Sequence, residues 1–162
     1  MNPISVDIVE TTWNSIAETS EDTASEMVTR MGEQQPLILA YLMEAGEDEL
    51  NQEEREHLLY LGIVVWQIML QGSTTPPMIN EEILEGVEEL NIKMLEYVEG
   101  EPDSDFVDTI QKIINSYNQP EVLRYIVEAL MEDPEEEESI IREENIGLLF
   151  IYLKTVIDCF DK

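Results

Sequence analysis

The sequence predicts an all-α protein of about eight helices. Apolar residues recur at intervals of three and four along most of the chain, and no run alternates apolar with polar residues as a half-buried strand would. The chain has 162 residues, of which 43% are hydrophobic, with few glycines and prolines. This length and composition suffice for a single helical domain, residues 1–162, with a substantial core.

The first half of the chain, residues 1–75, is expected to contain four helices. They are predicted over Val6–Ala17, Ala24–Met31, Pro36–Ala45 and Glu53–Leu70. The clearest break in the chain follows at Gly72 and the sequence TTPP, because glycine and proline both interrupt helices. We therefore predict a proline-containing connection between two halves at this point.

The fourth of these helices carries the longest apolar run, the 13 residues Leu58–Leu70. A membrane-spanning helix needs about 20 residues, so no membrane segment is expected. Apolar residues, including Trp66, cover every side of the run, which is typical of a helix enclosed by its neighbours. The run Ile146–Val156 has the same character, and Gly62 and Gly147 fall at equivalent points where two backbones could approach closely.

The second half, residues 78–162, is expected to contain four more helices. Asn80 is the predicted N-cap of the first, which is closed by Gly100 and Pro102. Its predicted apolar stripe consists of Ile83, Val87, Leu90, Met94 and Val98. The stripe of the following helix consists of Phe106, Ile110, Ile113, Ile114 and Tyr117. Pro120 opens the next predicted helix.

The last helix is predicted to begin at Pro134 and to reach Phe160. Asp133 is its expected N-cap and Glu136 the acid of a capping box. The glutamates of this first turn lie where the helix dipole favours negative charge, so they need no ligand to explain them. Cys159, the only cysteine, cannot form an internal disulfide and is predicted to be a buried apolar residue.

The two halves resemble each other in sequence. QPLILAYLMEA, from Gln35, matches QPEVLRYIVEA, from Gln119, at an offset of 84 residues. Other pairs at this offset are Trp13 with Tyr97, Ile8 with Ile92, and Ser20 with Ser104, and LGIVV matches IGLLF one residue further on. The match is poorest in the second helix of each half, where Met27 and Met31 oppose Gln111 and Asn115. We predict an internal duplication of a four-helix unit, residues 1–75 and 78–162.

The sequence contains no recognisable catalytic motif, and we expect neither catalytic nor cofactor-binding residues. Glu54 and His57 form an E-x-x-H spacing that resembles one half of the di-metal site of ferritin-like proteins. Such a site needs further inward carboxylates, whereas those of the next predicted helix mostly lie off its apolar stripe; they are Glu82, Glu85, Glu89 and Glu96. The second half has no matching motif. No metal is therefore expected.

Charge narrows the possible partners. Eight basic residues against 37 acidic ones give a net charge of -29, which repels nucleic acids and anionic membranes. The first residues have neither the basic region nor the apolar core of a secretory signal, so we expect a cytoplasmic, bacterial protein.

Three functions fit these patterns. The first is a non-catalytic helical module that binds another protein through an aromatic recognition surface. Its architecture would be either a pseudo-symmetric helical bundle or a short α-solenoid-like array of helix pairs. The candidates for that surface are Trp13, Tyr41, Trp66, Tyr97, Tyr117 and Tyr125, most of which are expected in the core. The second is an acidic mimic of a nucleic acid that binds a basic protein, for which a continuous acidic face would be required. A carboxylate-metal enzyme ranks last.

Overall fold

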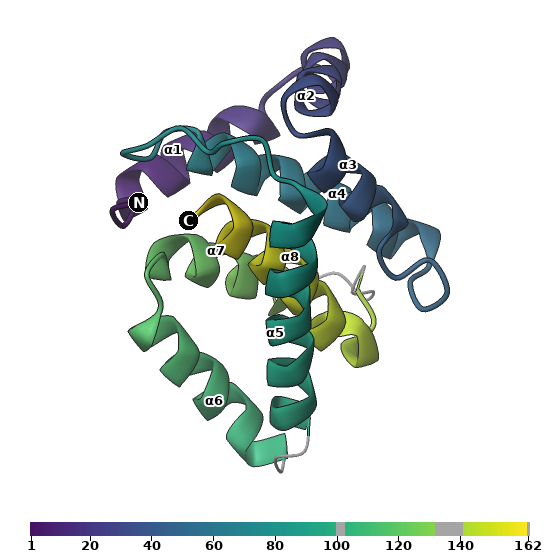
Figure 1. Ribbon diagram of the computed structural model, residues 1–162, viewed down its shortest axis with the longest axis vertical. Helices are drawn as coiled ribbons and strands as arrows, with labels where there is room; N and C mark the ends of the chain where they lie inside the picture. The colour runs from purple at the N-terminus through teal and green to yellow at the C-terminus, as the bar shows by residue number, and fades with distance from the viewer. Residues whose placement is uncertain (100–102, 132–140, 162) are drawn as a thin grey trace.

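The computed structural model describes residues 1–99, 103–131 and 141–161, and within these ranges it contains eight α-helices and no strand (Figure 1). The helices are α1 (Val6–Ala17), α2 (Glu21–Gln34), α3 (Pro36–Glu44), α4 (Gln52–Met69), α5 (Glu81–Glu99), α6 (Asp103–Ser116), α7 (Pro120–Met131) and α8 (Ile146–Phe160). A 3-10 turn over Glu143–Asn145 precedes α8. The all-α prediction is confirmed.

Helix starts follow local capping chemistry. Ser5 and Ser20 each accept a hydrogen bond from a backbone N–H of the first turn of α1 and α2. Asn51 and Glu54 form a reciprocal capping box at the start of α4. Asn80 Oδ1 accepts from the Ile83 N–H at 2.9 Å, so its predicted role as the N-cap of α5 is confirmed.

The prediction of one continuous helix from Pro134 to Phe160 is wrong. Arg142 is not helical, a 3-10 turn follows it, and α8 begins only at Ile146. The backbone turns here because Glu54 accepts hydrogen bonds from the backbone and side chain of Arg142. The predicted caps Asp133, Pro134 and Glu136 lie outside the described residues, as do Gly100 and Pro102.

The predicted apolar stripe of α5 is wrong at its centre. Leu90 is 69% exposed, and the residues buried against the core are Leu84, Val87 and Asn91. The reason is that Asn91 forms hydrogen bonds with polar groups of α8, which turns Leu90 toward solvent. The side chain of Val98 lies outside the described residues.

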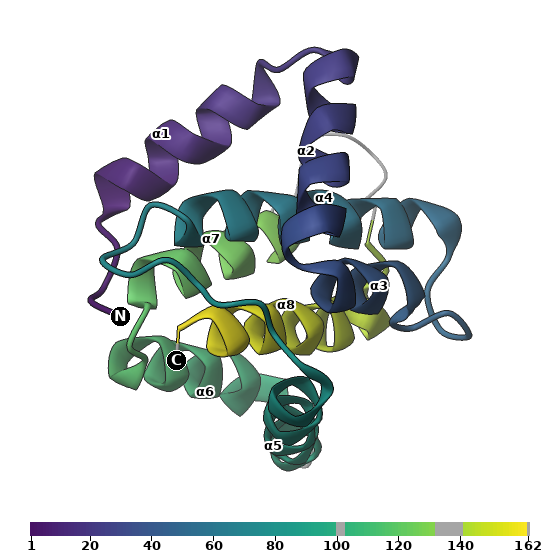
Figure 2. The same ribbon diagram turned by 45° about the horizontal axis from the view of Figure 1, so that its top comes forward.

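Helices α4 and α8 form the centre of the molecule and pack against each other (Figure 2). Helices α1 and α3 pack on α4, and α5 and α7 pack on α8, whereas α2 contacts α3 and α6 contacts α7. Trp66 of α4 and Phe160 of α8 are completely buried, as is Cys159. The prediction that both apolar helices are enclosed is confirmed.

Glycines in the central helices face leucine side chains. A Cβ on Gly62 would lie 2.7 Å from Leu42 Cδ2 of α3, and one on Gly147 would lie 3.3 Å from Leu95 Cδ1 of α5. The sequence predicted that these glycines let two backbones approach. Instead, the missing Cβ makes room for a side chain of a neighbouring helix.

Two buried glutamines hold the extended segments that precede α1 and α5. The side-chain oxygen of each glutamine accepts from a backbone N–H of the segment. Its side-chain nitrogen donates to the carbonyl of the residue two positions before that N–H. Gln119 pairs with Ile4 and Asn2 at 2.9 and 3.0 Å, and Gln35 pairs with Ile79 and Pro77 at 3.0 and 2.9 Å. Each glutamine thereby joins its own half of the chain to the beginning of the other half.

The two ends of the chain lie close together in both views (Figures 1 and 2). Asn118, between α6 and α7, donates to the Met1 carbonyl at 2.9 Å and to Asp161 Oδ2 at 2.8 Å. One amide therefore connects both termini.

Candidate functional site

Glu54 is a buried carboxylate that serves a structural role. Its side chain has no exposed surface and accepts from the Asn51 N–H at 2.9 Å, the Arg142 N–H at 3.0 Å and the Arg142 guanidinium at 2.8 Å. Asn145 Nδ2 lies 3.1 Å from both carboxylate oxygens. Burial alone would raise the pKa of Glu54, but these hydrogen bonds lower it to about 2. Glu54 is therefore ionised at neutral pH, with its oxygens occupied.

His57 does not share a site with Glu54. Its ring stacks on Tyr60, with the ring centroids 6.3 Å apart, and it lines a groove outside the core. The part of the chain that the structure describes contains no group of three or more His, Cys, Asp or Glu side chains that could hold a metal ion. The geometry thus gives the E-x-x-H pair separate surroundings.

An open groove of about 630 Å³ lies between α1, α4 and α7. This volume falls in the range of binding pockets. The described residues that line it are Trp13, Ala17, His57, Tyr60, Leu61, Tyr125, Val127, Glu128, Ala129 and Met131. We call this feature the aromatic groove.

Helical spacing explains how the aromatic groove is built. Trp13 and Ala17 lie four residues apart on α1, and His57 and Tyr60 lie three apart on α4, so each pair shares a helix face. Tyr125 of α7 stacks on Trp13, with ring centroids 6.1 Å apart and an angle of 23° between the rings. Burial raises the pKa of the Tyr60 hydroxyl above its ordinary value.

The six aromatic candidates from the sequence have different surroundings. Trp13 and Tyr125 line the aromatic groove, whereas Trp66 is enclosed in the core. Tyr41 packs edge-on against Tyr152, with ring centroids 5.9 Å apart. Tyr97 is 68% exposed on α5 and Tyr117 belongs to a polar cluster.

Sequence reasoning missed the contribution of His57, Tyr60 and Glu128 to the groove. The sequence favours a solvated or helix-capping histidine over a metal ligand at this position. The usable signal was the three-residue spacing of His57 and Tyr60, which places both rings on one side of α4. That α7 approaches this side depends on tertiary packing, which the sequence did not reveal.

Lys154 lies in a buried polar cluster between α5 and α8. Its Nζ donates to Asn91 Oδ1 at 2.9 Å and to Asp158 Oδ2 at 2.8 Å, and it lies 5.0 Å from the centre of the Tyr117 ring. Tyr117 donates its hydroxyl to the second oxygen of Asp158. Burial raises the pKa of Tyr117, and the negative charge of Asp158 raises it further. The cluster satisfies its polar groups internally and functions in packing.

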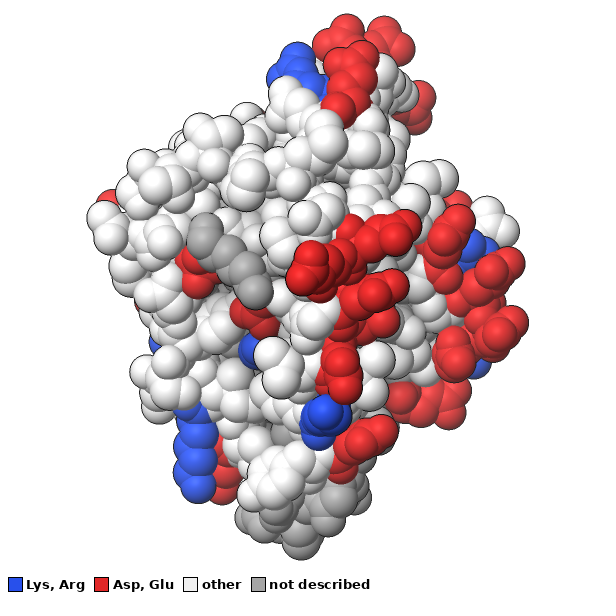
Figure 3. All heavy atoms as spheres, in the orientation of Figure 1, with Lys and Arg blue, Asp and Glu red and all other residues white. Residues whose placement is uncertain are grey.

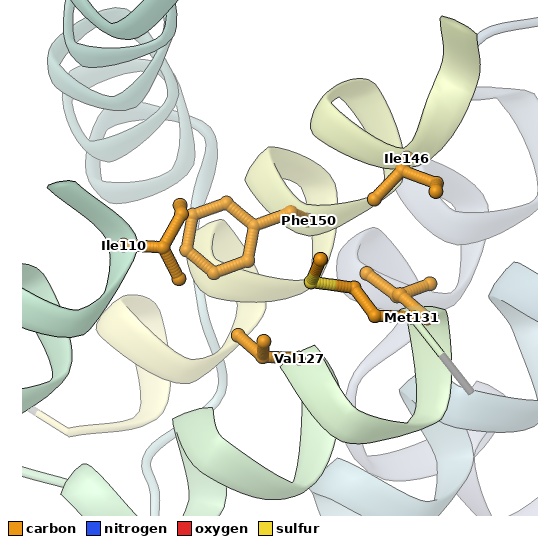
Figure 4. Close-up of a pocket in the computed structure, with 6 residues that line it drawn as sticks. Ile110, Val127, Met131, Ile146 and Phe150 are labelled. Atoms are coloured by element: carbon orange, nitrogen blue, oxygen red, sulfur yellow. The ribbon is translucent and has the colours of Figure 1, made fainter. Parts of the chain in front are cut away.

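A second cavity lies between α6, α7 and α8 and is entirely apolar (Figure 4). Its lining residues are Ile110, Val127, Leu130, Met131, Ile146 and Phe150. The volume of about 10 Å³ is close to that of a single water probe, and none of the described lining residues offers a polar side chain to hold a water. This cavity is a small packing gap and offers no ligand site.

On the face shown in Figure 3, acidic side chains gather over α5, over the turn between α3 and α4 and over α2, whereas the visible surface over α1 is largely uncharged. In α5, in the turn between α3 and α4 and in the adjoining ends of those two helices, the exposed acids are Glu44, Glu47, Asp48, Glu49, Glu53, Glu56, Glu81, Glu82, Glu85, Glu89 and Glu96. We call this surface the acidic face. The carboxylates of Glu49 and Glu88 both raise the pKa of Tyr152, after the larger effect of burial, so the two segments adjoin.

No family model, no curated protein and no solved structure matches the chain. Within residues 1–99, 103–131 and 141–161, no helix combines the length and hydrophobicity needed to cross a membrane.

Proposed function

We propose that the chain is a non-catalytic helical module that binds another protein through the aromatic groove. The observation that carries this proposal is an open groove of about 630 Å³ in which four aromatic rings come from three helices. Aromatic side chains supply large contact areas and are enriched where proteins bind each other. We also propose a cytoplasmic location.

A matched pair of tyrosine variants tests this function. Tyr60 is 39% exposed in the groove and Tyr97 is 68% exposed on α5, so neither substitution opens the core. A displayed random-peptide library would be selected on the folded protein, and the selected peptides would be measured against Tyr60→Ala and Tyr97→Ala. We expect binding to weaken only with Tyr60→Ala. If no selected peptide depends on Tyr60, the proposal is wrong.

The acidic face supports a second candidate function, mimicry of a nucleic acid. A concentrated set of carboxylates would occupy the basic surface of a DNA-binding protein, with a rapid association that weakens in salt. The test is displacement of labelled duplex DNA from a panel of basic DNA-binding proteins.

Two charge-matched variants provide the control for mimicry. The face variant carries Glu44→Gln, Glu47→Gln and Glu85→Gln. The reference variant carries Glu10→Gln on α1, Glu18→Gln at the C-cap of α1 and Glu26→Gln on α2. All six residues are exposed, and both variants lose the same charge. Mimicry predicts that only the face variant displaces less DNA, and equal displacement by both argues against it.

A carboxylate-metal enzyme has the weakest support. Glu54, the acid of the E-x-x-H spacing, already accepts hydrogen bonds from Asn51, Arg142 and Asn145. A metal ion would have to displace these donors. We therefore keep the metal enzyme only as the last of the three readings.

We also propose that the two halves arose by duplication. The sequence offset between equivalent residues differs from one pair of helices to the next. In this pairing α1 and α5 correspond at an offset of 75 residues, in place of the offset of 84 that matches Ile8 with Ile92 and Trp13 with Tyr97. The offset of 75 pairs the caps and the buried positions of the two helices. The pairs are Ile4 with Ile79, Ser5 with Asn80, Val9 with Leu84, and Thr12 with Val87. Buried Met31 of α2 pairs with buried Ile114 of α6 at an offset of 83, which improves the poorest part of the sequence match.

The two buried glutamines give this duplication its main support. Gln35 and Gln119 are equivalent at the offset of 84, and the segments they hold are equivalent at 75. Replacing residues 2–5 by the sequence PMIN of residues 77–80 tests the pairing. We expect the melting temperature to change little, whereas the residues at offset 84, GVEE, should lower it strongly. Equal loss with both replacements would contradict the duplication.

A further inference from the structure

We propose that the aromatic groove binds an arginine or lysine side chain of its protein partner. The partner segment would thus be basic and would carry an apolar residue beside the cation. This inference rests on the proposed function, because it names the chemistry of the segment that the groove receives.

The composition of the groove points to a cation. Trp13, His57, Tyr60 and Tyr125 offer aromatic faces, and Glu128 adds an exposed carboxylate at the edge of α7. The described lining residues include no lysine and no arginine. Aromatic faces attract guanidinium and ammonium groups, and a neighbouring carboxylate adds a charge-assisted hydrogen bond.

Apolar residues of the groove fit the aliphatic part of the same segment. Leu61, Val127 and Met131 line it together with the rings. Arginine and lysine carry long aliphatic stems that cover apolar surface while the charge stays at a polar edge. One basic side chain and one apolar neighbour would therefore match both parts of the lining.

The protein already contains this type of recognition in its interior. Lys154 Nζ lies 5.0 Å from the centre of the Tyr117 ring and 2.8 Å from Asp158 Oδ2. A ring and a carboxylate together hold a cation there. The groove presents the same two kinds of group in Tyr60, which is 39% exposed, and in the exposed carboxylate of Glu128.

Long-range charge favours the same partner. The net charge of -29 creates a negative potential that attracts basic segments and repels acidic ones. An acidic peptide would meet Glu128 in the groove and repulsion outside it. A basic peptide is attracted both by Glu128 in the groove and by the net negative charge at longer distance, so charge complementarity favours a basic partner.

Tryptophan fluorescence provides the test on the intact chain. The protein has two tryptophans, and Trp66 is enclosed, so an emission change on titration reports on Trp13. The probe is a short helical peptide with leucines on one face and arginines on the other. Its matched control replaces every arginine by citrulline, which is neutral and nearly isosteric. Both titrations use ~0.15 M salt, where long-range attraction is largely screened.

We expect the citrulline peptide to bind about tenfold more weakly than the arginine peptide. Tyr60→Ala and Glu128→Gln should each weaken the arginine peptide about threefold to tenfold, while Tyr97→Ala should leave it unchanged. Equal binding of the arginine peptide to Tyr60→Ala and Tyr97→Ala would place the contact elsewhere on the acidic surface and overturn the inference.

The peptide experiments distinguish a failure of this inference from a failure of the proposed function. If the peptide library yields neutral peptides that need Tyr60, and citrulline binds as well as arginine, the groove binds protein segments without selecting a cation. The proposed function then stands and this inference fails. If no library peptide needs Tyr60, the proposed function itself fails.

Discussion

Glu54 connects two parts of the chain that are distant in sequence. Its carboxylate caps α4 through Asn51 and holds Arg142, just before α8, through both the backbone and the side chain of that arginine. Asn145, at the start of α8, adds a third partner. A single buried acid therefore sets the relative position of the two central helices at one end. Removing its charge would leave these donors without an acceptor of equal strength.

We expect Glu54→Gln to lower the free energy of unfolding by about 2 kcal/mol at pH 7, because buried donors lose a charged acceptor. The native pKa of Glu54 is about 2, below its ordinary value of 4.5. A depressed pKa contributes stability above the unfolded value and loses it as the pH falls toward the folded value. The gap between wild type and variant should therefore shrink between about pH 4.5 and pH 2. Urea unfolding monitored by circular dichroism at several pH values measures this difference in the free energy of unfolding.

The exposed neighbour Glu56 supplies the control for this measurement. Glu56→Gln on the same helix should change the free energy of unfolding by about 0.5 kcal/mol or less. A Glu54→Gln gap that stays constant down to pH 2 would show that the charge of Glu54 contributes nothing to the fold.

Trp66 fills the centre of α4 and has no exposed surface. Trp66→Ala should lower the free energy of unfolding by about 3 to 5 kcal/mol, because it leaves a large cavity. Its indole N–H has no hydrogen-bond partner among the residues that the structure describes. Trp66→Phe therefore removes less volume and no hydrogen bond, and should cost clearly less. Thermal and urea unfolding of both variants provide the comparison. A small effect of Trp66→Ala would contradict the enclosed position.

Within single elements, two glycines offer opposite outcomes for the same substitution. Gly62 of α4 faces the fully buried Leu42, so Gly62→Ala should destabilise the protein by about 1 to 3 kcal/mol through overpacking. Around a would-be Cβ on Gly86 of α5, no described atom lies within 4 Å apart from the chain neighbours and the backbone of its own helix. Gly86→Ala should therefore raise stability by up to about 1 kcal/mol, because alanine favours the helix. A melting temperature that does not fall with Gly62→Ala would show that α3 does not contact α4 as described.

The positions of the helices could be predicted from the sequence more completely than the side of each helix that is buried. Predicted and observed bounds of α1 are identical, because its cap and its apolar spacing agree. The phase of α5 was wrong because Asn91 is buried by a polar cluster, and periodicity assigns buried positions only to apolar residues. The predicted start of α8 was wrong because the backbone N–H of Arg142, just before this helix, donates to Glu54, a residue distant in sequence.

The candidate site was predictable only in part, for a related reason. Trp13 and Tyr125 could be named as aromatic candidates from residue type. Their stacking requires α1 to lie beside α7, a contact between helices more than 100 residues apart in sequence. The acidic character was evident in the composition, whereas its concentration on α5 and the α3–α4 turn follows from the packing of those segments (Figure 3).

At the scale of the whole molecule, unbalanced charge is the dominant feature of the surface. With 37 acidic and eight basic residues, carboxylates repel one another most strongly where they are concentrated. The acidic face concentrates them on one side, and Glu49 and Glu88 approach the same tyrosine from different segments. Folding brings these segments together, so repulsion between them opposes the native state.

Added salt should therefore stabilise the protein at pH 8. The screening length falls from about 30 Å at 0.01 M salt to about 8 Å at 0.15 M, which removes most of the repulsion between separate helices. We expect the melting temperature to rise over this range of sodium chloride. The face variant, with Glu44→Gln, Glu47→Gln and Glu85→Gln, should show a smaller rise than the reference variant, because it reduces charge where the carboxylates are closest. Identical salt responses of the two variants would mean that the repulsion is spread evenly over the surface, and mimicry of a nucleic acid would then lose the concentrated face it requires.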